Sequence, residues 1–309
     1  MPEQHSFTSP LRYPGGKGPL ANFMKLTILL NGLSDGDYAE AYAGGAGIAW
    51  SLLFEEYVSR VHINDLSRPV YAFWHSVLYA TNDLCRLIND TDVTMDQWHR
   101  QREIQARSEQ VSLLELGFST FFLNRTNRSG ILKAGVIGGK NQDGPYKLDA
   151  RFNKADLIAR IKRIARYAGR IELYNLDAAK FISDALPQLN ARSLVYFDPP
   201  YYHKGEELYE NHYTHADHEA IAHLITTTVH QSWVVSYDST PEIERLYEGY
   251  SCVRYKVEYS AQNRYAGSEL IFLSPDLTVP PVGDPSKVKR KDLRTHVEYQ
   301  NSGQTYLMI

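Results

Sequence analysis

Residues 38–65 contain the pattern that most narrows the folds open to this chain. A strand pattern over 38–43 leads into the glycine loop AGGAG, and a helical pattern follows the loop. A second strand, RVHIND, then ends in Asp65. Strand, glycine-rich turn, helix, strand and acid is the order of a nucleotide-binding βαβ unit. The G-x-G-x-x-G spacing that indicates a pyrophosphate ligand is absent from the loop.

Further strand patterns return after a long interruption. Helical patterns cover 69–89, 95–124 and 154–168, and the glycine-rich stretch 129–148 reads as a hairpin or an ordered loop. The later strand patterns are IELYNLD (171–177), SLVYFD (193–198), SWVVSYD (232–238), 251–260 and SELIFLS (268–274). We therefore predict an α/β fold, a doubly wound and mostly parallel sheet, with a mainly helical domain inserted between its second and third strands.

The predicted boundaries follow from these patterns. Residues 1–67 and 170–275 form a discontinuous catalytic domain, 68–169 the inserted domain, and 276–309 a C-terminal tail that is rich in proline and polar residues. The tail carries the basic run KVKRK, which is most often simply solvated, although a tail that touches nucleic acid is an alternative.

Composition limits the class of protein. The chain has 309 residues, of which 43% are hydrophobic and 22% charged, as in ordinary globular proteins. Its two cysteines, Cys85 and Cys252, have no paired spacing, which argues against a disulfide framework or a zinc site. The sequence shows neither a secretory signal nor an apolar run of membrane-spanning length. We expect a cytoplasmic protein.

Charge is distributed unevenly along the chain. The net charge is −3, yet residues 120–170 hold twelve Lys and Arg and three acids, a local charge of +9. The remainder therefore carries −12. A basic stretch within an acidic chain is expected of a module that contacts phosphates, whereas a solvated basic face needs no partner.

The sequence Asp198-Pro199-Pro200-Tyr201 closes a buried strand pattern with an acid and two prolines. These residues suit methylation of an exocyclic amine on a nucleobase, whose lone pair is delocalised into the ring. The Asp198 carboxylate can accept one amine hydrogen. The Pro199 carbonyl can accept the other, because Pro200 restricts Pro199 to extended geometry. Tyr201 can stack on the base. A turn that merely ends a strand is the alternative.

This DPPY signature and the motifs around it resemble the Dam-like family of adenine-specific DNA methyltransferases. RYPGGKG near the N-terminus matches the family's aromatic-x-Gly-Gly-Lys element, and its Gly18 replaces the hydroxyl that a P-loop requires after Lys17. EAYAGGAG resembles the family's Glu-Pro-aromatic-x-Gly-x-Gly loop, with Ala41 in place of proline. The resemblance covers roughly residues 9–274 and implies the fold of S-adenosylmethionine-dependent methyltransferases.

The resemblance also implies a cofactor pocket for S-adenosyl-L-methionine. Its predicted residues are Tyr13, Lys17, Glu40, Tyr42, Gly44, Gly47, Asp65, Asp177 and Asp198. Lys17 would face the cofactor carboxylate or nearby acids, Asp65 the ribose hydroxyls, and Asp177 the adenine ring. Asp65 and Asp177 can alternatively be helix N-caps.

The stretch FFLNRTNRSGIL resembles the element that opens the family's target-recognition region. The predicted DNA-binding residues are Asn124, Arg125, Asn127, Arg128, Lys162 and Arg163. Asn124, Arg125, Asn127 and Arg128 are of the types that read base edges and phosphates, but Asn124 or Arg125 can instead be structural and hold the predicted hairpin to the helices. SYD (236–238) and NRYAGSELIF (263–272) match weaker family blocks that line the target-base pocket.

The histidines of HYTHADHEAIAHL suggest a metal site, but Thr214 and Asp217 have capping-box spacing before an apolar helix. Methyl transfer from a sulfonium needs no metal, so we predict none.

We predict a site-specific DNA adenine methyltransferase that acts on a flipped base. Alternatives are methylation of the cytosine amine or of RNA adenine, and a non-catalytic DNA-binding protein on the same fold. Asp198 speaks against glutamine methylation, which usually goes with Asn at that position. We expect a monomer that binds double-stranded DNA without a membrane or a metal. The resemblance implies a bacterial or phage-encoded protein, whose further partner, in restriction-modification, would be a restriction enzyme.

Overall fold

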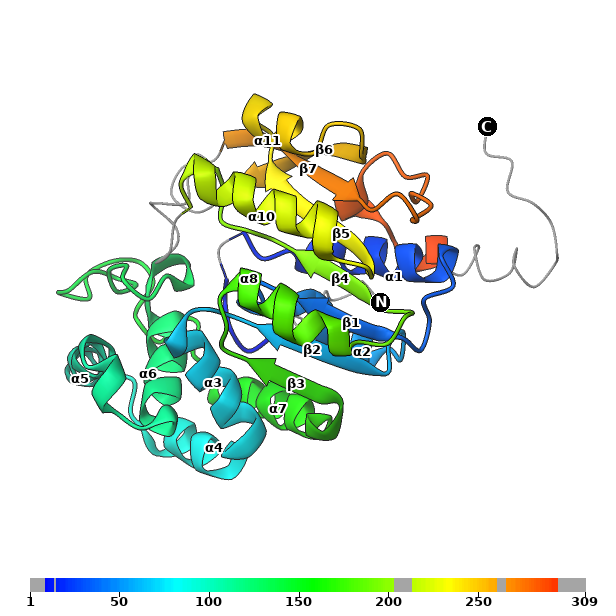
Figure 1. Cartoon of the computed structure of the whole chain (residues 1–309). Coiled ribbons are helices and arrows are strands. Elements are labelled where there is room, and N and C mark those ends of the chain that lie inside the picture. Colours follow the sequence, from blue (N-terminus) through cyan, green and yellow to red (C-terminus); the bar gives the residue numbers. More distant parts are fainter. Residues whose placement is uncertain (1–8, 14, 203–212, 260–264, 294–309) are drawn as a thin grey trace. The chain divides into compact units, whose positions relative to one another are not determined.

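The structure is a computed structural model that describes residues 9–13, 15–202, 213–259 and 265–293 (Figure 1). The chain divides into two compact units. Unit 1 comprises Met1–Gly16 and Asn64–Leu176, and unit 2 comprises Lys17–Ile63 and Asp177–Ile309. The division groups the first sixteen residues with the helices that follow Asp65, whereas our sequence boundaries lay at residues 67 and 170.

Unit 2 is built on a mixed sheet. Six of its strands are hydrogen-bonded in the order β2-β1-β4-β5-β7-β6. Their bounds are β1 (Asp37–Glu40), β2 (Arg60–Asn64), β4 (Leu194–Phe197), β5 (Ser232–Asp238), β6 (Ser251–Tyr259) and β7 (Tyr265–Leu273). The first four strands in this order are parallel, and β7 runs antiparallel to both β5 and β6. The predicted α/β class with a mostly parallel sheet is confirmed.

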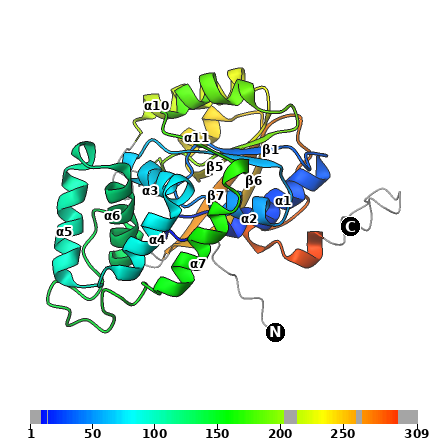
Figure 2. The same ribbon diagram turned by 90° about the horizontal axis from the view of Figure 1, so that it is seen from below.

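Helices cover both faces of this sheet, as a doubly wound fold requires. They are η1 (Gly18–Leu20), α1 (Ala21–Leu30), α2 (Gly47–Phe54), α8 (Ala178–Lys180), η5 (Phe181–Ala185), η6 (Leu186–Gln188), α10 (His215–Thr228), α11 (Pro241–Leu246) and η7 (Pro285–Lys287). Helices η1, α1 and α2 pack together, and α8, η5 and α10 form a second group. Figures 1 and 2 show the two groups on opposite faces of the sheet.

Strand β4 lies in the middle of the sheet and is buried on both faces. All four of its residues are buried, which is why it reads as a continuous apolar run rather than an alternating one. Because β1, β4 and β5 are parallel, their carboxyl ends meet at one edge of the sheet. This edge is where ligands bind in open α/β sheets.

Unit 1 is mainly helical. Its elements are α3 (Arg68–Tyr79), α4 (Thr81–Asp90), α5 (Met95–Ala106), η2 (Ser108–Gln110), α6 (Leu113–Thr126), η3 (Arg128–Gly130), α7 (Lys154–Ala165), η4 (Ala168–Arg170) and β3 (Ile171–Tyr174). Helix α6 packs against α3 and α5, and α4 packs against α7. The buried rings of Phe73 and Phe121 stack at 5.9 Å where α3 meets α6.

Two helices predicted in unit 1 are interrupted. The segment predicted over 69–89 breaks at Ala80, and the segment predicted over 95–124 breaks between α5 and α6. A capping box explains the second break, since the Ser112 hydroxyl accepts the Glu115 amide hydrogen while the Glu115 carboxylate accepts that of Ser112. Periodicity alone does not detect a restart of this kind.

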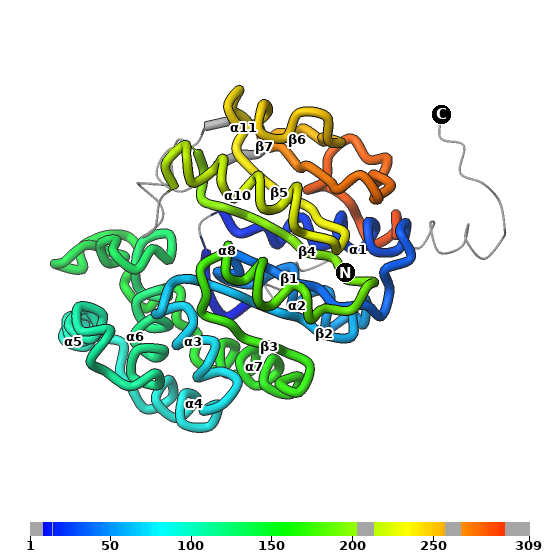
Figure 3. Tube along the Cα trace, in the orientation of Figure 1, coloured from blue at the N-terminus to red at the C-terminus, as the bar shows by residue number. Residues whose placement is uncertain are grey.

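The stretch 129–148 forms an ordered loop rather than a hairpin. In this stretch the described backbone contains one isolated bridge, between Asn127 and Val136, and no paired strands (Figure 3). The helix predicted over 154–168 ends at Ala165. Predictions that concern His212, residues 263–264 and the end of the tail from 294 lie outside the described residues. In the described part of the chain, no helix is both long and apolar enough to cross a membrane.

Candidate active site

Asp198 directly follows β4, at the carboxyl edge of the sheet of unit 2, and forms an ion pair with Lys17. The Lys17 Nζ lies 2.9 Å from Oδ1 of Asp198 and 3.2 Å from Oδ2. The two side chains are 7% and 19% exposed, so the pair is largely withdrawn from water. The sequence motifs RYPGGKG and DPPY, about 180 positions apart, are thereby joined in one site.

Lys17 is surrounded by acceptors. Besides Asp198, its Nζ donates to the Tyr201 hydroxyl at 3.3 Å and lies 3.8 Å from Oε1 of Glu269. Burial by itself lowers the pKa of Lys17, but Asp198, Tyr201 and Glu269 raise it, and the net pKa is well above its ordinary value. Lys17 is therefore a permanent cation in this site.

Glu269 also holds the side chain of Tyr201 in place. Its hydroxyl donates to Oε1 of Glu269 at 2.8 Å, while Tyr255 donates to Oε2 of Glu269. The Lys17 Nζ lies 4.9 Å from the centre of the Tyr201 ring, and Tyr201 is 3% exposed. Stacking of a base on this ring, as DPPY predicts, therefore requires the covering side chains to move.

A serine from the neighbouring strand completes the contacts of Asp198. The Ser236 hydroxyl donates to Oδ1 of Asp198 at 2.6 Å and lies 2.6 Å from the Tyr196 hydroxyl. Burial raises the pKa of Asp198 and Lys17 and Ser236 lower it, but burial has the larger effect, and the net pKa lies above its ordinary value. A carboxylate offers about four lone-pair positions, so acceptor capacity remains after these contacts.

The glycine loop after β1 is shaped by a buried acid. Glu40 is 4% exposed, and its Oε1 accepts hydrogen bonds from the Ala49 amide at 3.0 Å and the Tyr38 hydroxyl at 3.2 Å. Burial raises the pKa of Glu40 to about 8. By binding the first turn of α2, Glu40 fixes the start of that helix relative to the strand.

The backbone of this loop approaches a second glycine segment. Gly44 and Ala46 adopt left-handed conformations, with φ of 46° and 49°. They turn the chain so that Gly47 faces Gly18, where an added Cβ on Gly47 would lie 3.5 Å from the Gly18 Cα. A side chain longer than alanine at Gly47 would therefore narrow the space between the two segments.

Aromatic side chains connect three of the predicted motifs. The hydroxyls of Tyr42 and Tyr213 are 3.0 Å apart, and the Tyr213 ring packs on His218. His218, which is fully buried, contacts the Tyr237 hydroxyl through Nδ1 at 3.0 Å and packs against Tyr202. Burial lowers the pKa of His218 to about 4, so the ring is neutral.

The capping box predicted before α10 is confirmed by mutual hydrogen bonds of Thr214 and Asp217. The described residues contain no group of three or more His, Cys, Asp or Glu that could hold a metal.

The other three predicted cofactor residues are Tyr13, Asp65 and Asp177. Tyr13 and Asp65 belong to unit 1, where Oδ1 of Asp65 accepts the Ser67 amide hydrogen at 2.9 Å. Asp177 is exposed, and its Oδ1 accepts the Lys180 amide hydrogen as the N-cap of α8. The N-cap alternative thus describes the contact that Asp177 makes here.

Two of the predicted DNA-binding residues, Asn124 and Asn127, hold the backbone of unit 1. Asn124 is 3% exposed, and its amide exchanges two hydrogen bonds with the Arg12 backbone, at 2.8 and 2.7 Å, and donates to the Gly130 carbonyl. Asn127 is fully buried and accepts from Trp98 Nε1 at 2.7 Å while it donates to the carbonyls of Ile131 and Leu132. These contacts favour the structural alternative for Asn124, and they show a structural role for Asn127 that we did not consider from the sequence.

The predicted cations of unit 1 differ in exposure. Arg125 is half-buried and donates to the carbonyls of Arg151 and Pro10, and burial lowers its pKa to about 10. Arg128, Lys162 and Arg163 are exposed. Among the predicted cations, these three are therefore the exposed ones.

Glu269, Ser236 and Tyr255 make contacts in the site that we did not assign individually from the sequence. Glu269 lies in the apolar pattern SELIFLS, and an acid inside such a strand is the signal that could have identified it. In the register of the sheet, Glu269 on β7 lies opposite Asp238 on β5. Strand β5 also carries Ser236.

No curated protein matches the chain in sequence. Among solved structures, a "putative RNA methyltransferase" from Pyrococcus horikoshii is 10% identical, with a TM-score of 0.41, and 85% of this chain and 83% of that chain are covered. An rRNA methyltransferase from Streptomyces viridochromogenes is 14% identical, with a TM-score of 0.39, and 86% and 88% of the two chains are covered. Similarities this distant do not bear on the substrate.

The match to a family is more specific. The model of the family described as D12 class N6 adenine-specific DNA methyltransferase matches residues 13–261, which contain Lys17, the glycine loop and DPPY. The matched range includes residues of both units and most of the chain. The chain therefore belongs to the D12 class of N6 adenine-specific DNA methyltransferases.

Proposed function

We propose that the chain methylates double-stranded DNA at a specific site, moving a methyl group from S-adenosyl-L-methionine to the exocyclic N6 of an extruded adenine. Family membership supports adenine methylation. The buried pair of Lys17 and Asp198 at the end of β4 is the observation that carries the proposal, because a carboxylate held by Lys17 and Ser236 at this edge is placed to accept an amine hydrogen.

Asp198 acts as the fixed acceptor. Its contacts with Lys17 and Ser236 hold the carboxylate in one orientation before any substrate arrives. An acceptor that is already oriented stabilises charge developing on the amine without reorganisation. With the cofactor bound, the amine nitrogen would form a bond to the methyl carbon while the sulfur keeps the electron pair of the broken carbon–sulfur bond. The nitrogen would then lose one proton, which would pass by way of the Asp198 carboxylate to water.

Pro199, Pro200 and Tyr201 complete the target side. Both prolines are buried, and Pro200 keeps the Pro199 carbonyl in extended backbone, so that the carbonyl can serve as the second acceptor. Tyr201 is fixed at its hydroxyl by Glu269 and can support the base once its ring is uncovered. Extruding the base costs a few kcal/mol, which these contacts offset.

When bound, S-adenosyl-L-methionine supplies an electrophilic methyl group on a positively charged sulfur. The glycine loop suits such a cofactor, because Gly44 turns the backbone with a positive φ and Gly47, which has no side chain, opens α2. The N-terminus of a helix favours an anionic group such as a carboxylate. Glu40 binds the Ala49 amide of α2, and Tyr42 contacts Tyr213, so both side chains fix the ends of the loop to its surroundings. Tyr13, Asp65 and Asp177 remain predicted cofactor residues.

A substitution in the loop tests the cofactor pocket. Gly47→Leu should fold, because Gly47 lies at the first position of α2 without a left-handed φ, but its side chain should occupy the space beside Gly18. Calorimetric titration should show affinity for S-adenosylmethionine lowered by about tenfold or more, roughly 1.4 kcal/mol. Gly169→Leu, at a glycine with open space around it, is the matched control. Equal affinity in both variants would place the cofactor elsewhere.

The substrate is tested by incubating the protein with isotopically labelled cofactor and either duplex DNA or RNA. Mass spectrometry of the nucleosides should then find label in N6-methyldeoxyadenosine. Label in N4-methylcytosine or only in RNA would replace the proposed substrate by one of its alternatives, and absence of label in every nucleic acid would contradict the proposal.

A further inference from the structure

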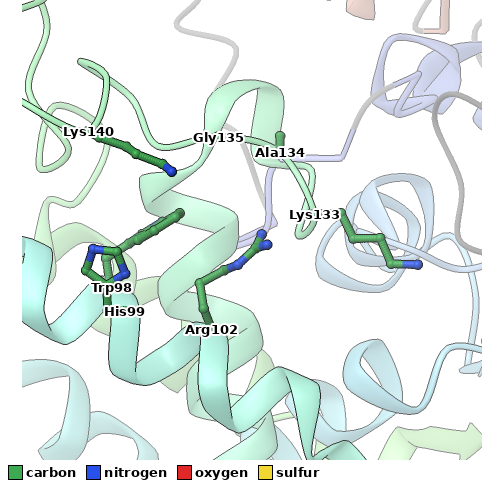
Figure 4. Close-up of a pocket in the computed structure, with 7 residues that line it drawn as sticks. All are labelled: Trp98, His99, Arg102, Lys133, Ala134, Gly135 and Lys140. Carbon is green, nitrogen blue, oxygen red and sulfur yellow. The ribbon is translucent and has the colours of Figure 1, made fainter.

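Unit 1 contains a pocket that lies outside every residue we assigned from the sequence. It has a volume of about 340 Å³ and lies between α5 and the loop that follows η3. Its wall is formed by Trp98, His99, Arg102, Lys133, Ala134, Gly135 and Lys140. Figure 4 shows Trp98, His99 and Arg102 on the helix, with the two lysines on the loop.

The chemistry of the wall selects an anion. Three of the seven lining residues, Arg102, Lys133 and Lys140, have cationic side chains. The imidazole of His99 is a further basic group, and the seven include no acid. Like charges that share one wall repel each other, so a bound anion lowers the energy of the site. The same loop lies within the stretch 120–170, whose charge is +9.

The pocket is held in shape by buried hydrogen bonds. Trp98 Nε1 donates to Asn127, whose amide binds the carbonyls of Ile131 and Leu132. Arg102 donates to the Leu132 carbonyl at 3.3 Å, and its guanidinium lies 5.5 Å from the Trp98 ring centre. A guanidinium has five N–H donors, and in the described residues this bond uses one of those of Arg102. The others can form a fork toward an anion.

We infer that this pocket binds a backbone phosphate of the nucleic acid substrate, an inference that rests on the proposed function for the polymer. A phosphodiester carries one charge and suits the fork of Arg102 with the ammonium group of Lys140, whereas Figure 4 shows the ammonium group of Lys133 directed away from these two. A stacked base is a poorer occupant, because Trp98 is 6% exposed and offers little ring surface. The pocket therefore positions the duplex and does not read its sequence.

Two variants test the pocket. Lys140→Gln removes an exposed charge, and Arg102→Lys keeps the charge but removes the fork. Arg100→Gln is the matched control, because Arg100 is exposed on the same helix and does not line the pocket. Binding of a fluorescent duplex, measured by anisotropy at several salt concentrations, gives the slope of log affinity against log salt.

Lys140→Gln should reduce the magnitude of the slope by about 0.9, the value for one phosphate contact, on substrate and scrambled duplexes alike. Arg102→Lys should lower affinity several-fold on both duplexes, while Arg100→Gln should match the wild type. Slopes and affinities equal to the wild type in Lys140→Gln and Arg102→Lys, with circular dichroism confirming the fold, would overturn the inference. So would a loss restricted to one sequence, which indicates base reading.

A competition experiment separates a polymer phosphate from a free anion. The experiment measures how much duplex is displaced when inorganic phosphate replaces chloride at equal ionic strength. This displacement should be no larger for the wild type than for Lys140→Gln. Selective displacement from the wild type would instead assign the pocket to free phosphate. If the wild type binds duplexes with the expected slopes but transfers no methyl group, the proposed function fails while the phosphate site stands.

Discussion

The two units of the molecule treat charge in opposite ways. Among the described residues, the fully buried acids and lysines, Lys25, Glu40 and Glu269, all belong to unit 2, as does the largely buried pair of Lys17 and Asp198. The buried polar side chains of unit 1 are amides and hydroxyls, such as those of Asn124, Asn127 and Ser119, and most of its cations lie at the surface.

This difference reflects what each unit has to do. Burying an ion costs several kcal/mol, which a pair recovers only with good geometry and further hydrogen bonds. In unit 2 this cost is incurred at Asp198, whose carboxylate is held in one orientation by Lys17 and Ser236. Unit 1 buries neutral amides at lower cost to fix a loop, and keeps its cations in water, where they can meet phosphates without a desolvation penalty of their own.

The largest effect expected from this comparison is at Asp198. Asp198→Ala removes the acceptor for the amine, and methyl transfer should fall by about a hundredfold to a thousandfold, since one preorganised partner of the transition state is lost. DNA binding should change little. Single-turnover transfer of labelled methyl groups measures the loss, with the exposed Asp184→Ala as the control. Near wild-type transfer by a folded Asp198→Ala protein would remove the catalytic assignment.

The buried acid Glu40 gives unit 2 a dependence of stability on pH. Its pKa is about 8 in the folded chain and about 4.5 when unfolded. Between these values Glu40 binds more protons in the folded state than in the unfolded state, so its contribution to stability is complete below pH 4.5 and is lost as pH rises to 8. Glu40→Gln cannot titrate, and should flatten this fall and raise stability at pH 8 by a few kcal/mol, given about 1.4 kcal/mol per pH unit.

Denaturant titrations of both proteins at pH 5, 6.5 and 8 measure the effect of Glu40. Glu219→Gln, an exposed glutamate on α10, controls for the loss of one negative charge. Parallel pH profiles for wild type and Glu40→Gln would show that folding does not shift the pKa of Glu40, and the pH dependence assigned to its burial would be wrong.

The corresponding change in unit 1 is at Asn127. Asn127→Ala removes three hydrogen bonds and leaves the buried Trp98 Nε1 without its partner, which should destabilise the protein by about 1–3 kcal/mol. Affinity for DNA should fall with the loosening of the loop. Thermal and chemical denaturation measure the loss, with the exposed Asn89→Ala as control. An unchanged stability with a large loss of sequence selectivity would show that Asn127 reads bases.

The sequence was most informative where strands end. The apolar run of β4 and the acid that follows it predict a carboxylate at the sheet edge, because parallel strands bring their carboxyl ends together. The pairing of Lys17 with Asp198 could not be derived from spacing, since about 180 residues separate them and only the fold brings them together.

Sequence patterns were weakest in unit 1. The residue types of FLNRTNR are those of a base-reading element, yet Asn124 and Asn127 use their amides on backbone carbonyls and on Trp98. Residue type alone cannot tell an amide that organises a loop from one that reads a base, because both roles use the same donors and acceptors. The glycines of 129–148 likewise indicate turns but do not specify a hairpin.

The smallest effect concerns the exposed cations of α7. Lys162→Gln and Arg163→Gln should leave stability within about 0.5 kcal/mol of the wild type, as surface substitutions usually do. If the basic face of unit 1 meets the phosphates, each should reduce the magnitude of the salt slope by up to about 0.9 for any duplex sequence. Lys180→Gln makes the same charge change on exposed α8 of unit 2 and should leave the slope unaltered. An equal change of slope in all three variants would mean that the overall charge of the protein governs DNA binding. The contrast between the exposed cations of unit 1 and the buried charges of unit 2 would then have no consequence for DNA binding.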